Sequence, residues 1–100
     1  MIVARAIFRA KFGKAADVVA HMKAQLANLS EEQLAAFQPR LLTDISGRFD
    51  TVVMETTHAN LATYEQMRAV FFAQQAASGE PSPMFDLVES GSNEYWTIET

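Results

Sequence analysis

Two side chains that could orient a ligand occur in a stretch with otherwise apolar helical spacing. Tyr64 and Arg68 are four residues apart, and Arg68 falls between Tyr64 and Phe72 on one helical stripe at about 100° per residue. A guanidinium among apolar side chains can hold an anionic or carbonyl group in a pocket between helix and sheet. In the alternative interpretation, Arg68 turns outward to solvent or pairs with Glu65 at i,i+3 spacing.

Two further residues, His58 and Trp96, are candidates for the same pocket. His58 ends a strand-like run, and an imidazole that lines a cavity titrates near neutral pH and can act as a base. Trp96 lies in the last β-rich run, where a tryptophan more often belongs to a core or an interface than to a ligand platform. In the alternative interpretation, His58 is simply a surface or strand-end residue. Tyr64, Arg68, His58 and Trp96 are therefore pocket candidates, and we assign no catalytic role to any of them.

Several other kinds of chemistry lack the residues they need. The chain has no cysteine, which excludes thiol catalysis, disulfides and Cys-based zinc sites. No pair of histidines, and no histidine with a carboxylate, has the helical spacing of metal ligands. Gly47 stands alone, without a lysine or a following helix, so the stretch around it predicts a hairpin turn rather than a phosphate loop. We predict no metal site.

A second group of charged residues is expected on one face of a sheet. From Ile2 to Lys11 the chain alternates, with Arg5 and Arg9 on the same side as two aliphatic residues. Asp44 and Glu55 are potential partners for these arginines across the sheet. The group Arg5, Arg9, Asp44 and Glu55 is interpreted either as a paired network that fixes the register of a dimer or as an inter-subunit pocket.

The elements that must position these residues follow from periodicity and turn chemistry. We expect strands at 2–11, 40–45, 49–57 and 94–100, a helix from Gly13–Lys14 through an apolar stripe to Leu29, a short helix from Ser30 to Phe37, a helix after Asn60, a helical turn at 84–88 and a loop at 91–93. The order predicts an α+β, ferredoxin-like βαββαβ fold, a four-stranded antiparallel sheet with helices on one face. Because the other face would carry apolar residues among charges, we expect it to be buried against a second copy.

Composition sets the broad class. One hundred residues, 49% of them hydrophobic, predict a single domain over 1–100 with a packed core. The net charge is −4 and there is no basic stripe, which argues against nucleic acid as a partner. No apolar run approaches the roughly 18 residues of a membrane span, and the first residues lack the pattern of a signal peptide. We expect a soluble, cytoplasmic protein with no membrane partner.

Three stretches carry a resemblance to a known superfamily: Phe12-Gly13-Lys14, residues 43–55 and residues 87–96. They resemble the dimeric α+β barrel superfamily, and in particular its NIPSNAP-like members. The resemblance implies a homodimer in which two sheets stack face to face. The superfamily includes cofactor-free oxygenases, haem-degrading enzymes, isomerases and plain binders, so the fold leaves the function open. The histidine, asparagine and tryptophan of the haem-degrading members have no counterpart around His21 or His58, and we predict no cofactor.

Two classes of function therefore stay open. The first is a small-molecule-binding enzyme, a cofactor-independent oxygenase or isomerase acting on a small aromatic or carbonyl compound. The second is a non-catalytic metabolite-binding or structural homodimer. An enzyme requires a cavity where Arg68, Tyr64 and a base such as His58 converge. A purely structural dimer predicts that the large apolar residues fill that space completely, namely Phe8, Phe71, Phe72, Met84 and Phe85.

Overall fold

The computed structural model describes residues 1–100. Its elements are β1 (Ile2–Ala10), α1 (Ala15–Leu26), α2 (Glu31–Phe37), β2 (Arg40–Thr43), β3 (Thr51–His58), α3 (Leu61–Ser78), α4 (Met84–Leu87) and β4 (Val88–Thr97). The strands form one antiparallel sheet in the order β2-β3-β1-β4. This is the predicted α+β, ferredoxin-like arrangement, and the fold class is confirmed.

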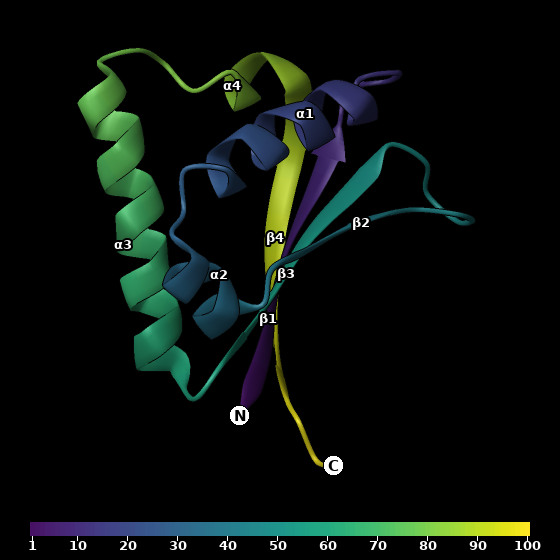
Figure 1. The fold of residues 1–100 in the computed structure, drawn as a ribbon. Helices are drawn as coiled ribbons and strands as arrows, with labels where there is room; N and C mark the ends of the chain where they lie inside the picture. The colour runs from purple at the N-terminus through teal and green to yellow at the C-terminus, as the bar shows by residue number, and fades with distance from the viewer.

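The helices cover one face of the sheet, and the core beneath them is divided in two. Figure 1 shows α1 and α2 lying across the sheet while α3 stands beside them as a separate column. One buried cluster joins α1 to β1 and β3 and consists of Ala10, Val18, Met22 and Val52. The other joins α3 to β1 and consists of Ala4, Tyr64 and Met67. Because each helix packs through its own cluster, the region between the clusters is not closed by core side chains.

The helix starts follow the predicted capping signals. Ser30 and Gln33 form a reciprocal capping box at the start of α2. Asn60 caps α3, with Thr63 returning the second hydrogen bond. None of the four helices combines the length and the apolar composition that a membrane span requires.

The loop between β2 and β3 is longer than the predicted turn. The strands pair as expected, but β2 ends at Thr43 and β3 begins at Thr51, so the turn at 46–48 is only the middle of the connection. Two carboxylates of this loop accept hydrogen bonds from backbone donors: Asp44 accepts from the Thr51 N–H at 3.0 Å, and Asp50 accepts from the Gly13 N–H at 2.9 Å. Asp44 thus closes the loop at the start of β3, and Asp50 joins the loop to the turn that precedes α1.

The last strand is displaced from its predicted position. β4 runs from Val88 to Thr97, so the predicted loop at 91–93 lies inside the strand and residues 98–100 lie outside it. β4, which includes the polar residues of the predicted loop, pairs with nearly the whole of β1, and Gly91 lies opposite Phe8. The backbone ladder offered by β1 thus outweighs the low strand propensity of this serine- and glycine-containing segment.

Candidate ligand-binding site

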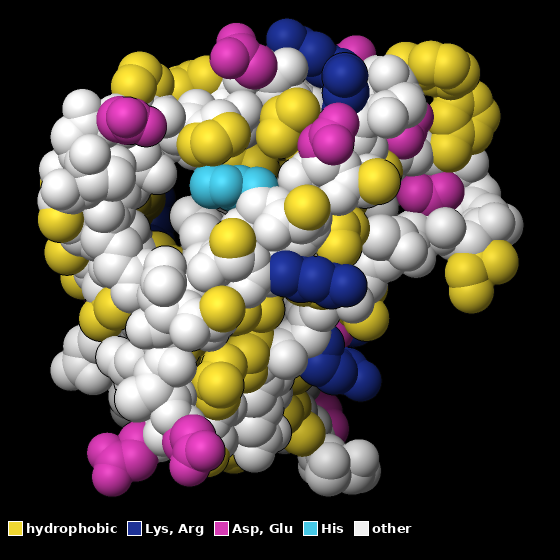
Figure 2. Space-filling view, turned by 45° about the horizontal axis from the view of Figure 1, so that its top comes forward, with side chains coloured by type: hydrophobic (Ala, Val, Ile, Leu, Met, Phe, Trp, Pro, Cys, Tyr) yellow, Lys and Arg dark blue, Asp and Glu magenta, His cyan; other side chains and the backbone are white.

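A cavity of about 380 Å³ lies between α3 and the helix-covered face of the sheet. Its volume is within the usual range for small-molecule sites. Figure 2 shows an opening between α3 and the rest of the molecule. Ten of the 16 lining residues are hydrophobic: Ala4, Ala6, Phe8, Met22, Met54, Tyr64, Met67, Phe71, Phe72 and Met84. The polar lining residues are Gln25, Thr56, Arg68, Gln75, Ser82 and Asn93.

Small residues on β1 and separate helix packing create this space. Ala4 and Ala6 form part of its wall on the sheet side, where a larger side chain would fill the gap between the two core clusters. Met84, from the predicted helical turn, lines the cavity, whereas Phe85 is 79% exposed and points away from the core. A purely structural dimer would require the large apolar residues to fill this space completely. They do not, because the cavity remains open beside them.

Tyr64 and Arg68 both line the cavity, as the sequence places them on one helical stripe. Tyr64 is buried and packs edge-on against Tyr95 at 5.3 Å between ring centroids. Burial raises the pKa of Tyr64, and the neighbouring Tyr95 hydroxyl adds to the effect, so Tyr64 is a neutral hydroxyl at physiological pH. Its hydroxyl suits hydrogen bonding to a ligand better than proton abstraction.

Arg68 lies at the exposed rim of the cavity. Its guanidinium carbon is 5.0 Å from the centroid of the Phe72 ring, a cation–π distance. It forms no ion pair with Glu65 or with any other carboxylate. The exposure of Arg68 agrees with the alternative in which it turns outward to solvent, whereas its pairing with Glu65 is not observed. Its hydrogen-bond donors remain available to an anionic group.

His58 lies behind the cavity rather than in its wall. The side chain is 3% exposed and packs between Phe37 and Tyr64, with ring-centroid distances of 5.8 and 5.5 Å. Burial lowers the pKa of His58 below its ordinary value of 6.5. Its Nε2 lies 2.7 Å from Oγ1 of Thr56, and Thr56 does line the cavity.

Thr56 was not among the residues selected from the sequence. Its only signal is spacing: Thr56 and His58 are two apart on a strand, so their side chains lie on the same face. That signal gains meaning only once α3 is known to cover that face.

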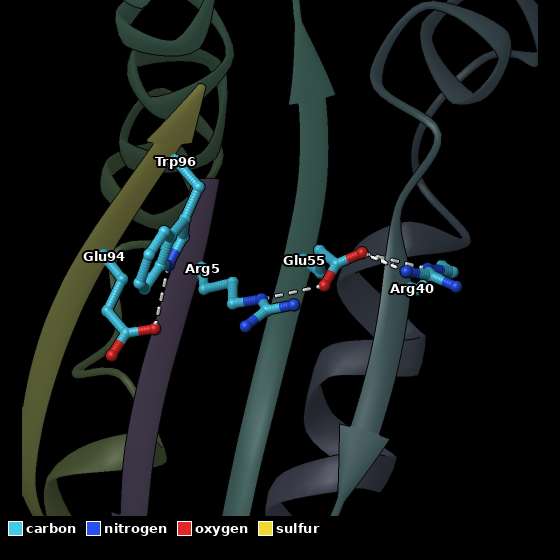
Figure 3. A network of polar contacts seen from close by, with 5 residues as sticks. All are labelled: Arg5, Arg40, Glu55, Glu94 and Trp96. Carbon is cyan, nitrogen blue, oxygen red and sulfur yellow. Dashed lines mark hydrogen bonds and ion pairs between the residues drawn. The ribbon is translucent and has the colours of Figure 1, made fainter. Parts of the chain in front are cut away.

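Trp96 is not brought to this cavity. Side chains alternate along β4, and Trp96 pairs with Val3 while Tyr95 pairs with Ala4. Tyr95 therefore faces the helices, and Trp96 lies on the bare face, 56% exposed, with its Nε1 donating to Glu94 at 3.2 Å (Figure 3). A pocket containing both Tyr64 and Trp96 within one subunit is thus ruled out by the parity of the last strand.

On the bare face, Glu55 is the centre of the charged group. It is 4% exposed, Arg5 donates to its Oε2 at 2.9 Å, and Arg40 donates to its Oε1 from the other side (Figure 3). These bonds, above all those from Arg40, hold the pKa of Glu55 below its ordinary value. Arg40 is a partner that the sequence did not indicate.

The other two residues predicted for this face, Arg9 and Asp44, lie together but do not pair. Both line a polar hollow of about 410 Å³ on the bare face, yet no ion pair joins them. Asp44 is engaged with Thr51 in the hairpin loop, and Nη1 of Arg9 is buried without a hydrogen-bond partner. Nowhere in the fold do three histidine or carboxylate side chains gather as metal ligands would.

Comparison with known proteins identifies solved structures that share this architecture. No family model and no curated protein matches the sequence. Among solved structures, an uncharacterised NIPSNAP domain protein from Burkholderia xenovorans superimposes with a TM-score of 0.71 at 15% identity, over 98% of this chain and 94% of that chain. A NIPSNAP family protein from Agrobacterium tumefaciens gives 0.75 at 18% identity, over 96% and 90%.

The chain has the fold of the NIPSNAP domain proteins. The resemblance noted in the sequence is thereby confirmed at the level of fold. A putative antibiotic biosynthesis monooxygenase from Deinococcus radiodurans shares the same fold more distantly, with a TM-score of 0.62 at 14% identity over 100% of this chain and 94% of that chain. These superpositions establish common architecture, and the function has to be argued from this chain's own cavity.

Proposed function

We propose that this protein is a homodimer that binds a small, mostly apolar molecule carrying an anionic or carbonyl group, in the cavity between α3 and the sheet. One observation carries the proposal: the cavity is open and largely apolar, and an arginine without a carboxylate partner stands at its rim. Apolar walls with a few convergent polar groups are the usual composition of a small-molecule site.

The lining favours orientation of the ligand at two points. Arg68 supplies a positive charge and several donors, while Tyr64 supplies a neutral hydroxyl deeper against the sheet. The amides of Gln75 and Asn93 complete the polar set. An aromatic or aliphatic carboxylic acid, or a compound with an equivalent carbonyl, matches this distribution.

The homodimer is supported by the composition of the bare sheet face. Val3, Ile7 and Val53 lie there among the charged residues, together with Leu42 and Trp96, which are exposed. Burial of this face against a second copy would remove these apolar groups from water.

Between an enzyme and a binder, the residues that line the cavity favour a binder. Tyr64 and Arg68 are its only ionisable lining groups, and neither is a base at neutral pH. A cofactor-independent oxygenase or isomerase remains the second candidate, because the fold is shared with a putative monooxygenase and because His58 lies one hydroxyl away from the cavity.

Calorimetric titration with a matched ligand pair tests the proposal. Benzoate and benzamide have nearly the same shape, and only benzoate is charged. We expect benzoate to bind, and Arg68→Gln to weaken benzoate about tenfold, as loss of a charge-assisted hydrogen bond would, and to weaken benzamide, which offers only a neutral carbonyl, much less. Glu65→Gln, on the exposed side of the same helix, should leave both unchanged. Absence of binding, or equal affinities in Arg68→Gln and wild type, would contradict the proposal.

A further inference from the structure

Thr56 makes a hydrogen bond between the cavity wall and a buried base. Its side chain lines the cavity, and its Oγ1 lies 2.7 Å from Nε2 of His58, which is almost wholly enclosed. The two side chains lie on the same face of β3 because they are two residues apart. A change in the protonation of His58 therefore changes the hydrogen bonding of a hydroxyl that lines the cavity.

The surroundings of His58 keep it uncharged in the protein without a ligand. Phe37 of α2 and Tyr64 of α3 pack against its ring, and Tyr95 of β4 lies beyond Tyr64. The adjacent carboxylate in the strand, Glu55, lies on the opposite face and is taken up by two arginines. The charged group on the cavity side is Arg68, one helical turn from Tyr64. No carboxylate therefore pairs with the imidazole, so an imidazolium formed here depends on the negative charge of the bound ligand.

We infer that Thr56 and His58 form a proton relay into the cavity and that the ligand carries a weakly acidic O–H group, as in a phenol or an enol. The inference rests on the proposed binding function of the cavity. In the relay, the ligand's O–H bond breaks and its proton passes to Oγ1, while the proton of the Thr56 hydroxyl passes to Nε2 of His58. Thr56 is unchanged, the ligand becomes an oxyanion and His58 an imidazolium, and no oxidant or reductant is consumed.

The electrostatics of the cavity support this step. The ligand's negative charge develops in a mostly apolar enclosure, where a cation stabilises it more strongly than in water. Arg68 at the rim is such a cation, and it has no competing carboxylate. The relay uses the neutral tautomer of His58 that carries its proton on Nδ1, which leaves Nε2 free to accept from Thr56.

The absorbance spectrum of a bound phenol reports its protonation state directly. The probe is 4-nitrophenol, whose phenolate has a visible absorption band that the neutral phenol lacks. Binding is followed by calorimetry, at a pH slightly below the pKa of the free probe. We expect the wild-type complex to show the phenolate band, and Thr56→Val and His58→Gln to lose most of it while still binding the probe. Thr56→Ser keeps a hydroxyl and should restore the band.

A control on the same strand separates the relay from general effects on stability. Thr57 is adjacent to Thr56, but its side chain is on the bare face, so Thr57→Val should behave as wild type. A bound probe that stays neutral, or a band that persists in Thr56→Val, overturns the relay and leaves the binding function intact. Binding of benzoate without any binding of 4-nitrophenol overturns the inferred ligand class. Failure of both ligands to bind overturns the proposed function as well.

Discussion

Arg5 donates a hydrogen bond from its Nε to Oε2 of Glu55 at 2.9 Å, and the two residues are direct partners in the β1–β3 ladder. Arg40 is the direct partner of Glu55 in the β2–β3 ladder and binds the other carboxylate oxygen. Three neighbouring strands thus contribute one ion triad along a single row of the bare face (Figure 3). The triad encloses a carboxylate that would otherwise be exposed to water on this side of the sheet.

Replacement of Glu55 by Gln should destabilise the fold, because two arginines lose their common carboxylate. Arg5 and Arg40 are 41% and 66% exposed in their side chains, so solvent screening limits the loss to about 1–2 kcal/mol. In a domain of this size each kcal/mol corresponds to roughly 4–8 °C in melting temperature. Thermal unfolding at neutral pH measures the effect, with Glu65→Gln as the exposed control.

The same residue predicts a dependence on acid. The folded-state pKa of Glu55 is lowered from 4.5, so its contribution to stability is complete above pH 4.5 and is lost as the pH falls through the folded value. The stability difference between wild type and Glu55→Gln should therefore shrink below pH 4.5. A difference that stays constant down to strongly acidic pH would show that the triad does not stabilise the carboxylate form.

His58 should produce a separate pH dependence nearer neutrality. Burial lowers its folded-state pKa below 6.5. Between the folded-state pKa and pH 6.5, the imidazole is therefore protonated in the unfolded chain but mostly neutral in the folded chain. Stability should be highest above pH 6.5 and fall as the pH drops from there toward the folded value. His58→Gln should remove this step in a series of melting curves, and His21→Gln, on α1, should retain it.

Ile7 lies on the bare face of β1 beside Arg5 and Arg9. A substitution at this position tests whether the protein is a homodimer. If the two sheets stack, light scattering of the wild type gives twice the chain mass of 11.1 kDa, and Ile7→Lys gives the monomer mass because a further positive charge beside Arg5 and Arg9 is costly to bury. Leu61→Glu, an exposed apolar position on α3, should keep the dimer mass. A wild-type protein of monomer mass at micromolar concentration would reject sheet stacking.

The fold followed from the sequence because its signals are local. The alternation of β1, the capping boxes at Ser30 and Asn60, and the short helix at 84–87 each depend on residues a few positions apart. The boundaries of β4 did not follow, because Ser90 and Gly91 adopt a strand only in response to the ladder of β1.

The site was predictable only in part, for the same reason. Tyr64 and Arg68 share a helical stripe, so their common cavity was expected. Trp96 was named as a pocket candidate but lies on the other face, because the face of a strand residue depends on its register with the neighbouring strand. Arg40 with Glu55, and Thr56 with the cavity, are contacts between elements, and no periodicity within one element encodes them.

Two alanines of β1 provide a test of the cavity without any ligand. Ala4 is 2% exposed and packs directly against Tyr64 and Met67, whereas Ala6 is only half-buried and lies against the open part of the space. Ala4→Leu adds volume to a closed contact and should cost about 1–3 kcal/mol. Ala6→Leu adds the same volume where there is room, so its melting temperature should stay close to that of wild type or rise. Because the added side chain occupies the cavity, Ala6→Leu should also lose benzoate binding. Equal destabilisation by the two substitutions would mean that the space beside Ala6 is closed in solution, and retention of benzoate binding by Ala6→Leu would place the ligand elsewhere.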